Sequence, residues 1–442
     1  MEKKKYRWII CGAAFFCQAL VSAIGNNVFL FNVMFLEAFY QSKADTAWAG
    51  SILWFTMALF SPIAGIVVKK FSCRVCVMLG GLLMCVGLTV SAFTRTLTMQ
   101  YLTFGVITGA GMGLSFTPTF VIIAAYFDEQ QTLATGIAAS GSGMGGLAFS
   151  FIISALKDHY GWRGAFLFLG ALVFNVTLCG ALMKPLPTSQ KKNSSSINLK
   201  VLVDPIYIIL GFATFLWGLS RGITLLHLIA FAINQGMSSI QATLIASFVS
   251  VGSIIGRLII GVIGNLKNMD RSILYCGSFA VSAIIMALLP TLGKMFWGQI
   301  LQAVLFGAIS NVFFVLMAPI AVDILGIENL SISFGVLMVV LGTGSMTGPP
   351  IGGWLFDQTL SYSKTFYTSS ALAVISSIVG AVVPIMRRRK RLKEALQKSI
   401  VKSRISMENI SKQSPQHESS ETEKMLTSAD NAKVDIVSEN IS

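Results

Sequence analysis

The side chains in this sequence best suited to bind a charged molecule are a few basic residues inside long apolar segments. Arg257 is the only full charge between Ala246 and Leu266, and Arg221 and His227 lie in the apolar segment before it. Burying an arginine at membrane depth costs about 2.5 to 17 kcal/mol, so such a residue normally faces a protein interior, a water-filled cavity or a ligand. We therefore predict a binding site around Arg257.

Carboxylates are missing from the same depth. We place the 19 acidic residues of the chain in its polar tail, in loops or near the ends of predicted helices. A cavity that holds fixed positive charge and no carboxylate suits an anionic or zwitterionic solute, whose own carboxylate would pair with a guanidinium. The sequence therefore predicts Arg257, Arg221 and His227 as candidate substrate-binding residues, with Asn311 as a further polar candidate.

Each of these side chains also has a structural interpretation. Arg257 would serve equally well in an ion pair or as a donor to backbone carbonyls, and Arg221 could snorkel or do the same. A lone histidine between helices is often a hydrogen-bonded structural donor. Asn26, Asn27 and Asn311 could be no more than polar contacts between helices.

The elements that must position these residues are membrane-spanning helices. Hydrophobic residues make up 54% of the 442-residue chain and charged residues only 12%, which indicates a polytopic membrane protein. A helix needs roughly 20 apolar residues to cross a bilayer. We therefore predict an all-α membrane protein with twelve transmembrane helices, at 8–36, 47–68, 75–93, 99–126, 131–156, 164–183, 205–233, 240–264, 273–290, 295–325, 330–356 and 366–386.

The twelve helices divide into two bundles of six. We predict an N-terminal half at 1–183, a cytosolic linker at 184–204, a C-terminal half at 205–386 and a polar, disordered cytosolic tail at 387–442. Lysines and arginines gather on the side of the linker and both termini, which predicts that these segments are cytosolic. The basic run Arg387–Arg391 is interpreted as a topology anchor at anionic lipid or, alternatively, as a partner-binding motif.

Three features are typical of moving parts. Small residues recur at helical spacing at Gly136, Ser140 and Gly143, and they give a face on which a second helix can lie close. The run Gly348–Pro350 is expected to interrupt the eleventh helix, which would either kink it or expose backbone carbonyls to a cavity. Asp323, at the cytosolic end of the tenth helix, is expected to form a salt bridge that breaks as the halves move.

Other observations exclude alternative classes. The net charge of +14 arises from short basic clusters between apolar runs, so it does not indicate a nucleic-acid-binding domain. Cys73 and Cys76 form a lone C-x-x-C with no second pair of metal ligands. The glycine-rich loop that binds nucleotide phosphates does not occur in the sequence. We expect no cofactor, no metal and no enzymatic activity.

Several stretches carry a resemblance to a known family. Twelve helices divided six and six by a basic loop resemble the layout of the major facilitator superfamily. The loop Gly65–Val75, with Lys69, Lys70 and Arg74, resembles the cytosolic loop motif of that superfamily, although the usual Asp is absent and Lys69 stands near its place. Four segments are similar, in order, to stretches of the monocarboxylate transporter family, solute carrier family sixteen: Tyr126–Gly146, Gly161–Gly170, Val322–Gly335 and Gly348–Asp357.

The resemblance implies a divergent member of this family. The fifth-helix motif of the family has basic residues where this chain has Asp128–Gln130. Proton-coupled members carry an Asp one turn before the arginine of helix eight and a Lys in helix one, where this chain has Ser253 and either Asn26 or Asn27. Neither Ser nor Asn titrates near neutral pH, so we expect facilitated or exchange transport rather than obligatory proton symport.

On this resemblance we expect a secondary transporter in the plasma membrane that moves monocarboxylates or similar small organic anions by alternating access. A single-span accessory glycoprotein is a partner that some members of the family need. One alternative is a carrier of neutral or zwitterionic metabolites, such as aromatic amino acids, creatine-like compounds or thyroid-type hormones. A second alternative is a receptor or scaffold that signals through its tail.

Overall fold

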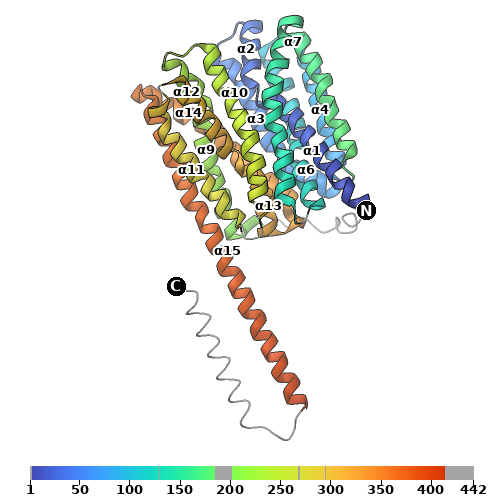
Figure 1. Cartoon of the computed structure of the whole chain (residues 1–442). Helices are drawn as coiled ribbons and strands as arrows, with labels where there is room; N and C mark the ends of the chain where they lie inside the picture. The colour runs from blue at the N-terminus through green and yellow to red at the C-terminus, as the bar shows by residue number, and fades with distance from the viewer. Residues whose placement is uncertain (1, 128, 185–201, 267–268, 294, 414–442) are drawn as a thin grey trace. The chain divides into compact units, whose positions relative to one another are not determined.

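The computed structural model describes residues 2–127, 129–184, 202–266, 269–293 and 295–413. Every regular element within these ranges is helical, which confirms the predicted all-α fold. The chain divides into two compact units, Met1–Pro384 and Ile385–Ser442. The helices of the first unit run side by side (Figure 1). The predicted linker falls almost entirely on residues 185–201, which lie outside the described ranges, as does Asp128.

Helices up to residue 182 form the first part of this unit. They alternate with short turns, and one stretch is a π-helix. In chain order they are α1 (Glu2–Gly25), α2 (Val28–Phe39), α3 (Lys43–Lys70), α4 (Cys73–Ser91), α5 (Leu97–Gln100), the π-helix η1 (Tyr101–Thr108), α6 (Gly109–Tyr126) and α7 (Gln131–Leu182).

Helices from residue 205 onward form the second part. The first two begin with side-chain caps: the Asp204 side chain accepts from the backbone N–H of Ile206, and Ser238 and Gln241 form a capping box. In chain order they are α9 (Pro205–Asn234), α10 (Ser239–Ile263), α11 (Arg271–Leu292), α12 (Phe296–Ser310), α13 (Val312–Leu325), the short 3-10 helix η3 (Ile327–Asn329), α14 (Leu330–Thr359) and α15 (Tyr362–Gln413).

Eleven stretches of the described chain are long and apolar enough to cross a membrane. The difference from the predicted twelve arises in α7, which spans 52 residues and joins the predicted helices 131–156 and 164–183. At about 1.5 Å per residue, such a helix is more than twice as long as the roughly 30 Å hydrocarbon core. Gly161 interrupts it with φ 69° and ψ 175°, a backbone conformation that favours glycine. The count of twelve therefore stays a prediction, with Gly161 as the dividing residue.

Two predicted continuous helices are broken at asparagines. The helix predicted at 8–36 is interrupted at Asn26–Asn27, and the helix predicted at 295–325 is interrupted at Asn311, where φ is −99° and ψ is 0°. At each break an asparagine Nδ2 donates to a carbonyl four residues earlier, from Asn27 to Ala23 at 2.8 Å and from Asn311 to Gly307 at 3.2 Å. The side chain thus takes the place of the missing helical amide.

Glycines let the two parts of the first unit approach each other at backbone distance. A Cβ added to Gly136 of α7 would lie 2.6 Å from the carbonyl oxygen of Arg257 in α10. A Cβ added to Gly335 of α14 would lie 2.6 Å from the Cα of Pro62 in α3. The pairs α7–α10 and α3–α14 therefore connect the helices before residue 183 to those after residue 204.

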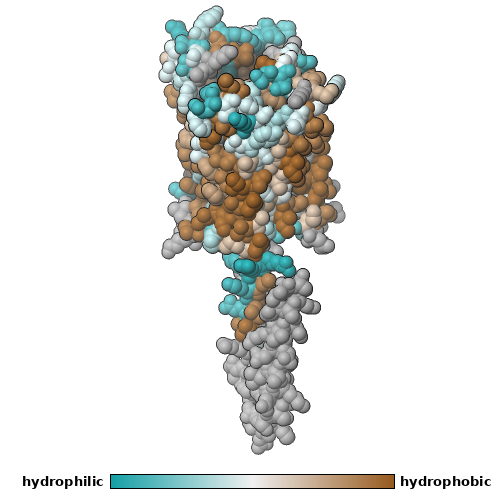
Figure 2. All heavy atoms as spheres, turned by 90° about the vertical axis from the view of Figure 1, so that its left-hand side faces the viewer, coloured by the Kyte–Doolittle hydropathy of each residue, from teal (hydrophilic) through white to brown (hydrophobic). Residues whose placement is uncertain are grey.

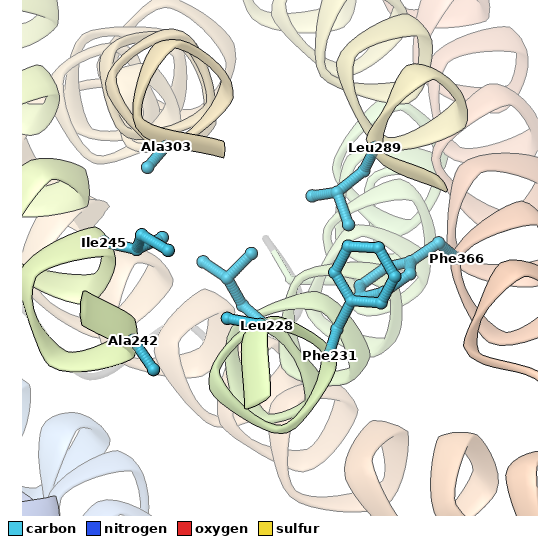
Figure 3. Packing of buried hydrophobic residues seen from close by; sticks show 8 residues of the cluster. Leu228, Phe231, Ala242, Ile245, Leu289, Ala303 and Phe366 are labelled. Carbon is cyan, nitrogen blue, oxygen red and sulfur yellow. The ribbon is translucent and has the colours of Figure 1, made fainter. Parts of the chain in front are cut away.

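The apolar side chains of the first unit are divided between its interior and its outer surface. Figure 2 shows hydrophobic residues covering much of one face of this unit, with hydrophilic residues gathered at its upper end. Inside, one cluster of buried residues joins α9, α10, α11, α12 and α15 (Figure 3). It consists of Leu228, Phe231, Ala232, Ala242, Ile245, Leu289, Ala303 and Phe366.

The second unit differs from the predicted disordered tail. Helix α15 continues to Gln413, so residues 387–413 are helical. Ten of these 27 residues are Lys or Arg, whose long side chains favour a helix, whereas the sequence argument weighed only the polarity of the stretch. Residues 414–442 lie outside the described ranges.

Candidate functional site

Arg257 lies at the contact between α7 and α10. Its side chain is buried, with 4% of the residue exposed. The Nη1 atom donates to the carbonyl oxygen of Ala139 at 2.9 Å and to the hydroxyl oxygen of Ser142. The Nη2 atom donates to Oδ1 of Asn311 at 3.4 Å. The guanidinium thus joins α10 to α7 and to the helix break at Asn311.

Arg221 reaches the same break from α9. Its Nη2 atom donates to Oδ1 of Asn311 at 3.3 Å, so a single amide oxygen accepts hydrogen bonds from two arginines. Arg221 is half-buried, whereas Arg257 is almost fully buried. The structure therefore brings together Arg221, Arg257 and Asn311, three of the seven predicted substrate-binding residues.

The two arginines keep unused donors. The Nε atoms of Arg221 and Arg257 are buried and have no hydrogen-bond partner. Within the described part of the chain, neither arginine forms a salt bridge with a carboxylate. A buried charge that lacks a counter-charge is costly, and a buried donor without an acceptor costs about 1 to 3 kcal/mol. The site is therefore positive and incompletely satisfied.

Aromatic side chains cover one side of the arginine pair. The Arg257 Cζ atom lies 5.6 Å from the centre of the Phe314 ring in α13. The Phe314 ring in turn meets Phe116 of α6 edge to face, with 5.8 Å between centroids. Such rings attract a guanidinium through their negative faces and keep water from it. The site thus combines cationic donors with an apolar wall.

Three further predicted polar residues lie on α10 and at the break between α1 and α2. Ser253 is buried on α10, one helical turn before Arg257. Asn26 is exposed, and its Nδ2 atom donates to the backbone carbonyl of Ser142 at 3.0 Å, so it shares a neighbour with Arg257. Asn27 is buried and donates to the carbonyl of Gly146 at 3.2 Å, which makes it a contact between the broken first helix and α7.

The polar contact of His227 is with α14. A ring nitrogen, Nε2, lies 3.2 Å from the carbonyl oxygen of Pro349 in α14. A Cβ added to Gly352 would lie 2.9 Å from the same ring, so this glycine makes room for the imidazole. These contacts match the structural interpretation of His227, a donor or acceptor between helices.

The expected interruption of the eleventh helix is wrong. Helix α14 continues from Leu330 to Thr359 with Pro349 and Pro350 inside it. Prolines in membrane helices are tolerated where neighbouring groups satisfy or shield the freed carbonyls. Here α9 packs closely on this stretch, because a Cβ added to Gly222 would lie 2.6 Å from the carbonyl oxygen of Ser345.

The Asp323 carboxylate forms a salt bridge with Arg271 of α11 at 3.3 Å. Both residues lie after residue 204, so this ion pair does not itself join the two parts of the first unit. The expected latch is therefore not formed by this pair.

The basic residues of the Gly65–Val75 loop lie at helix ends. Arg74 donates through Nη2 to the carbonyl oxygen of Ala181 at 2.6 Å, near the C-terminal end of α7. Lys69 and Lys70 occupy the last turn of α3. Cations at these ends are favoured by the partial negative charge of the helix C-terminus. These positions support a structural role within the first part of the chain.

Sequence reasoning missed several groups that complete the site. The Ser142 hydroxyl, the Ala139 carbonyl and the Phe314 ring all contact Arg257. Ser142 lies in the same run of small residues as Gly136, Ser140 and Gly143, whose face was predicted to meet another helix. That run was a usable signal for Ser142. The sequence gives no comparable signal for the backbone carbonyl of Ala139 or for Phe314, which is one of 31 phenylalanines.

Comparison with known proteins gives consistent relatives. The model for "Major Facilitator Superfamily" matches residues 14–302 and 210–415. Monocarboxylate transporter 12 of Xenopus laevis is 30% identical over 420 residues, which cover 88% of this chain and 91% of that protein. Monocarboxylate transporter 12-B of Danio rerio is 29% identical over 445 residues, which cover 90% and 93%.

Solved structures give the same fold. The E. coli fucose:proton symporter FucP superposes with a TM-score of 0.70 at 16% identity, and the match covers 85% of this chain and 98% of that one. The human organic anion transporter MFSD10 superposes with a TM-score of 0.67 at 13% identity, covering 85% and 99%. At these identities the likeness concerns the fold alone.

Proposed function

Because the chain belongs to the Major Facilitator Superfamily and, within it, to the monocarboxylate transporter family, we propose that it carries monocarboxylates or similar small organic anions across the plasma membrane. The same family membership makes the chain an integral multi-pass membrane transporter and not an enzyme. The proposal includes a location in the plasma membrane, with or without a single-span accessory glycoprotein.

The observation that carries the proposal is the pair of arginines on Asn311. Arg257 and Arg221 each keep a buried Nε donor without an acceptor, and neither has a carboxylate partner among the described residues. A carboxylate accepts two parallel hydrogen bonds from a guanidinium, which few other groups do. A solute carboxylate would satisfy both the charge and the unused donors.

A zwitterionic solute fits this site less well. Its ammonium group needs acceptors, and the acceptor that the two arginines share, Oδ1 of Asn311, already receives two hydrogen bonds. An ammonium beside two guanidinium groups is also repelled. The arrangement therefore favours anions over amino acids and creatine-like compounds.

Alternating access is supported by where the helices meet. The close approaches between α7 and α10 run from Gly136 to Gly146, toward the end of α7 that is predicted to be cytosolic. The contacts of α3 with α14 include an approach near the predicted cytosolic ends of both helices, where a Cβ added to Gly65 would overlap the carbonyl of Ser331. We infer a carrier closed on its cytosolic side, in which the solute reaches the arginines from the outer side.

The proposed mechanism does not require a proton. Ser253 lies one turn before Arg257, and Asn26 and Asn27 lie in the broken first helix. None of these side chains titrates near neutral pH. The charge of the solute is therefore balanced by the arginines alone, which fits facilitated diffusion or exchange.

The test is uptake of labelled pyruvate in cells that lack endogenous carriers of it. Wild-type protein should take up pyruvate, and Arg257→Gln should lower uptake by about tenfold or more, because a charge-assisted hydrogen bond is lost. Arg163→Gln is a matched control, since its guanidinium is exposed and lies over the Trp162 ring. A wild-type protein present at the cell surface that takes up neither pyruvate nor any other small organic anion would overturn the proposal.

A further inference from the structure

The charges at the site exceed what a monocarboxylate can balance. We propose that the preferred cargo is a short dicarboxylate, with one carboxylate paired with Arg257 and the other with Arg221. This inference rests on the proposed function, because it assumes that the arginine pair is the solute site. It goes further by naming the number of anionic groups that the solute carries.

The two guanidinium groups are held close together. The Nη2 atom of Arg221 lies 3.3 Å and that of Arg257 lies 3.4 Å from the same Oδ1 atom of Asn311. Asn311 is itself fixed, because its Nδ2 atom donates to the Gly307 carbonyl and to the Ser310 hydroxyl at 3.2 Å and 3.3 Å. A short molecule with a carboxylate at each end spans two cations held at this separation.

Each arginine keeps donors for its own carboxylate. A guanidinium has five N–H donors. Arg221 makes one hydrogen bond, to Asn311, and its Nε is buried without a partner. Arg257 uses Nη1 and Nη2 for Ala139, Ser142 and Asn311, and its Nε is likewise buried without a partner. Each of the two cations therefore has an unsatisfied donor to offer to a carboxylate of its own.

The charge balance leads to the same conclusion. A monocarboxylate leaves one guanidinium uncompensated at membrane depth, where an isolated charge is strongly disfavoured. Asn311 supplies only a neutral dipole to the pair, and no described carboxylate contacts either arginine. A dianion makes the occupied site neutral, so the occupied carrier can change conformation without carrying net charge.

The order in which the two carboxylates bind follows from burial. Arg221 is half-buried, whereas only 4% of Arg257 is exposed. The first carboxylate therefore meets Arg221, and the second then reaches Arg257 beside Phe314. Arg221 is the residue that distinguishes a dicarboxylate from a monocarboxylate.

The experiment compares uptake of labelled succinate and labelled pyruvate by the full-length protein in proteoliposomes. Wild-type protein should transport succinate, and unlabelled succinate should inhibit pyruvate uptake. Arg221→Gln should lower the ratio of succinate to pyruvate uptake by about tenfold, and Arg221→Lys should restore part of it because the charge returns. The control Arg163→Gln should leave the ratio unchanged.

Three outcomes would overturn the inference. Pyruvate uptake without succinate uptake or succinate inhibition removes the dicarboxylate and leaves the proposed function intact. Pyruvate uptake that requires chloride, again without succinate uptake, assigns the second positive charge to an inorganic anion. Reconstituted wild-type protein that transports neither succinate, pyruvate nor any other small organic anion removes both proposals. Succinate inhibition of pyruvate uptake is measured on the wild-type protein. It therefore tests the dicarboxylate inference even if Arg221→Gln fails to fold.

Discussion

Arg257 of α10 donates a hydrogen bond to the Ser142 hydroxyl of α7, across a helix pair that connects the parts of the membrane region before and after the linker. The residue proposed to bind the solute therefore also links the two parts that are proposed to move in alternating access. A carboxylate that draws the guanidinium toward itself competes with this bond. Binding and the change of conformation are thereby coupled through one side chain.

Removing the Ser142 hydroxyl should weaken this conformation. Ser142→Ala leaves the Nη1 atom of Arg257 with the Ala139 carbonyl as its remaining acceptor, and a bond to a charged donor contributes about 1.5 to 3 kcal/mol. We expect the melting temperature of the purified protein to fall by a few degrees. Ser150→Ala is the control, because that hydroxyl bonds only to Leu147 of its own helix. Equal melting temperatures for the two variants would contradict this account.

A carboxylate at position 311 should replace the solute. In Asn311→Asp, both arginines gain an internal counter-charge at the position of Oδ1. We expect anion uptake to fall by about tenfold or more, with a melting temperature equal to or above that of the wild type. Asn311→Leu is the paired variant: it removes the acceptor without adding charge, so its melting temperature should fall. Wild-type uptake by Asn311→Asp would mean that the positive charge of the pair is not used.

Uptake by the wild type should depend little on an imposed proton gradient. Ser253 and Asn26 or Asn27 stand where proton-coupled members of the family carry titratable side chains, and neither Ser nor Asn titrates near neutral pH. Ser253→Asp adds a carboxylate one turn before Arg257, where its ionised form competes with the solute. Protonation removes that competition, so uptake by the variant should rise as the pH is lowered. Initial rates at several outside pH values measure both effects. Steep acceleration of the wild type by an inward proton gradient would rule out the proposed mechanism.

His227 should matter for stability and not for solute affinity. Its ring bonds to the Pro349 carbonyl and fills the space beside Gly352, so His227→Ala removes a contact between α9 and α14. We expect a lower melting temperature and less protein at the cell surface, with the KM for the solute changed by less than about twofold. A KM raised by tenfold at normal surface level would return His227 to the binding site.

The tail should be dispensable for transport. A chain that ends at Met386 keeps all of the described residues around the arginine pair. We expect the rate of anion uptake per molecule at the cell surface to stay near that of the full-length protein. Loss of uptake at equal surface level would favour the alternative in which the tail has a signalling or regulatory role.

The location of the candidate site could be predicted from one residue. A single arginine in an otherwise apolar segment is so costly that it must be explained, and the family resemblance then added Ser253 one turn before it. The partners of Arg257 could not be predicted in the same way. Ala139 contributes a backbone carbonyl and Phe314 a ring, and neither residue type signals a contact with a cation in a sequence so rich in both.

The helical composition could also be predicted, whereas the helix breaks could not. The length of an apolar stretch identifies a membrane span because the thickness of the hydrocarbon core sets how many apolar residues a helix needs to cross it. The breaks at Asn26–Asn27 and Asn311 depend on whether an asparagine side chain bonds to its own helix. The prolines in α14 predicted a break that the helix does not have. The packing of α9 on this helix, which accompanies its continuity, cannot be read from the sequence.

The glycine seam between α7 and α10 gives a way to choose which state of the carrier is populated. A methyl group on Gly136 would meet the carbonyl oxygen of Arg257 at 2.6 Å, in a backbone that cannot easily yield. Overpacking of this kind costs about 1 to 3 kcal/mol, which shifts the equilibrium between two conformations by about 5- to 150-fold. Gly136→Ala should therefore enrich the opposite conformation, with α7 and α10 apart, and so supply the half of the transport cycle that the present structure does not contain.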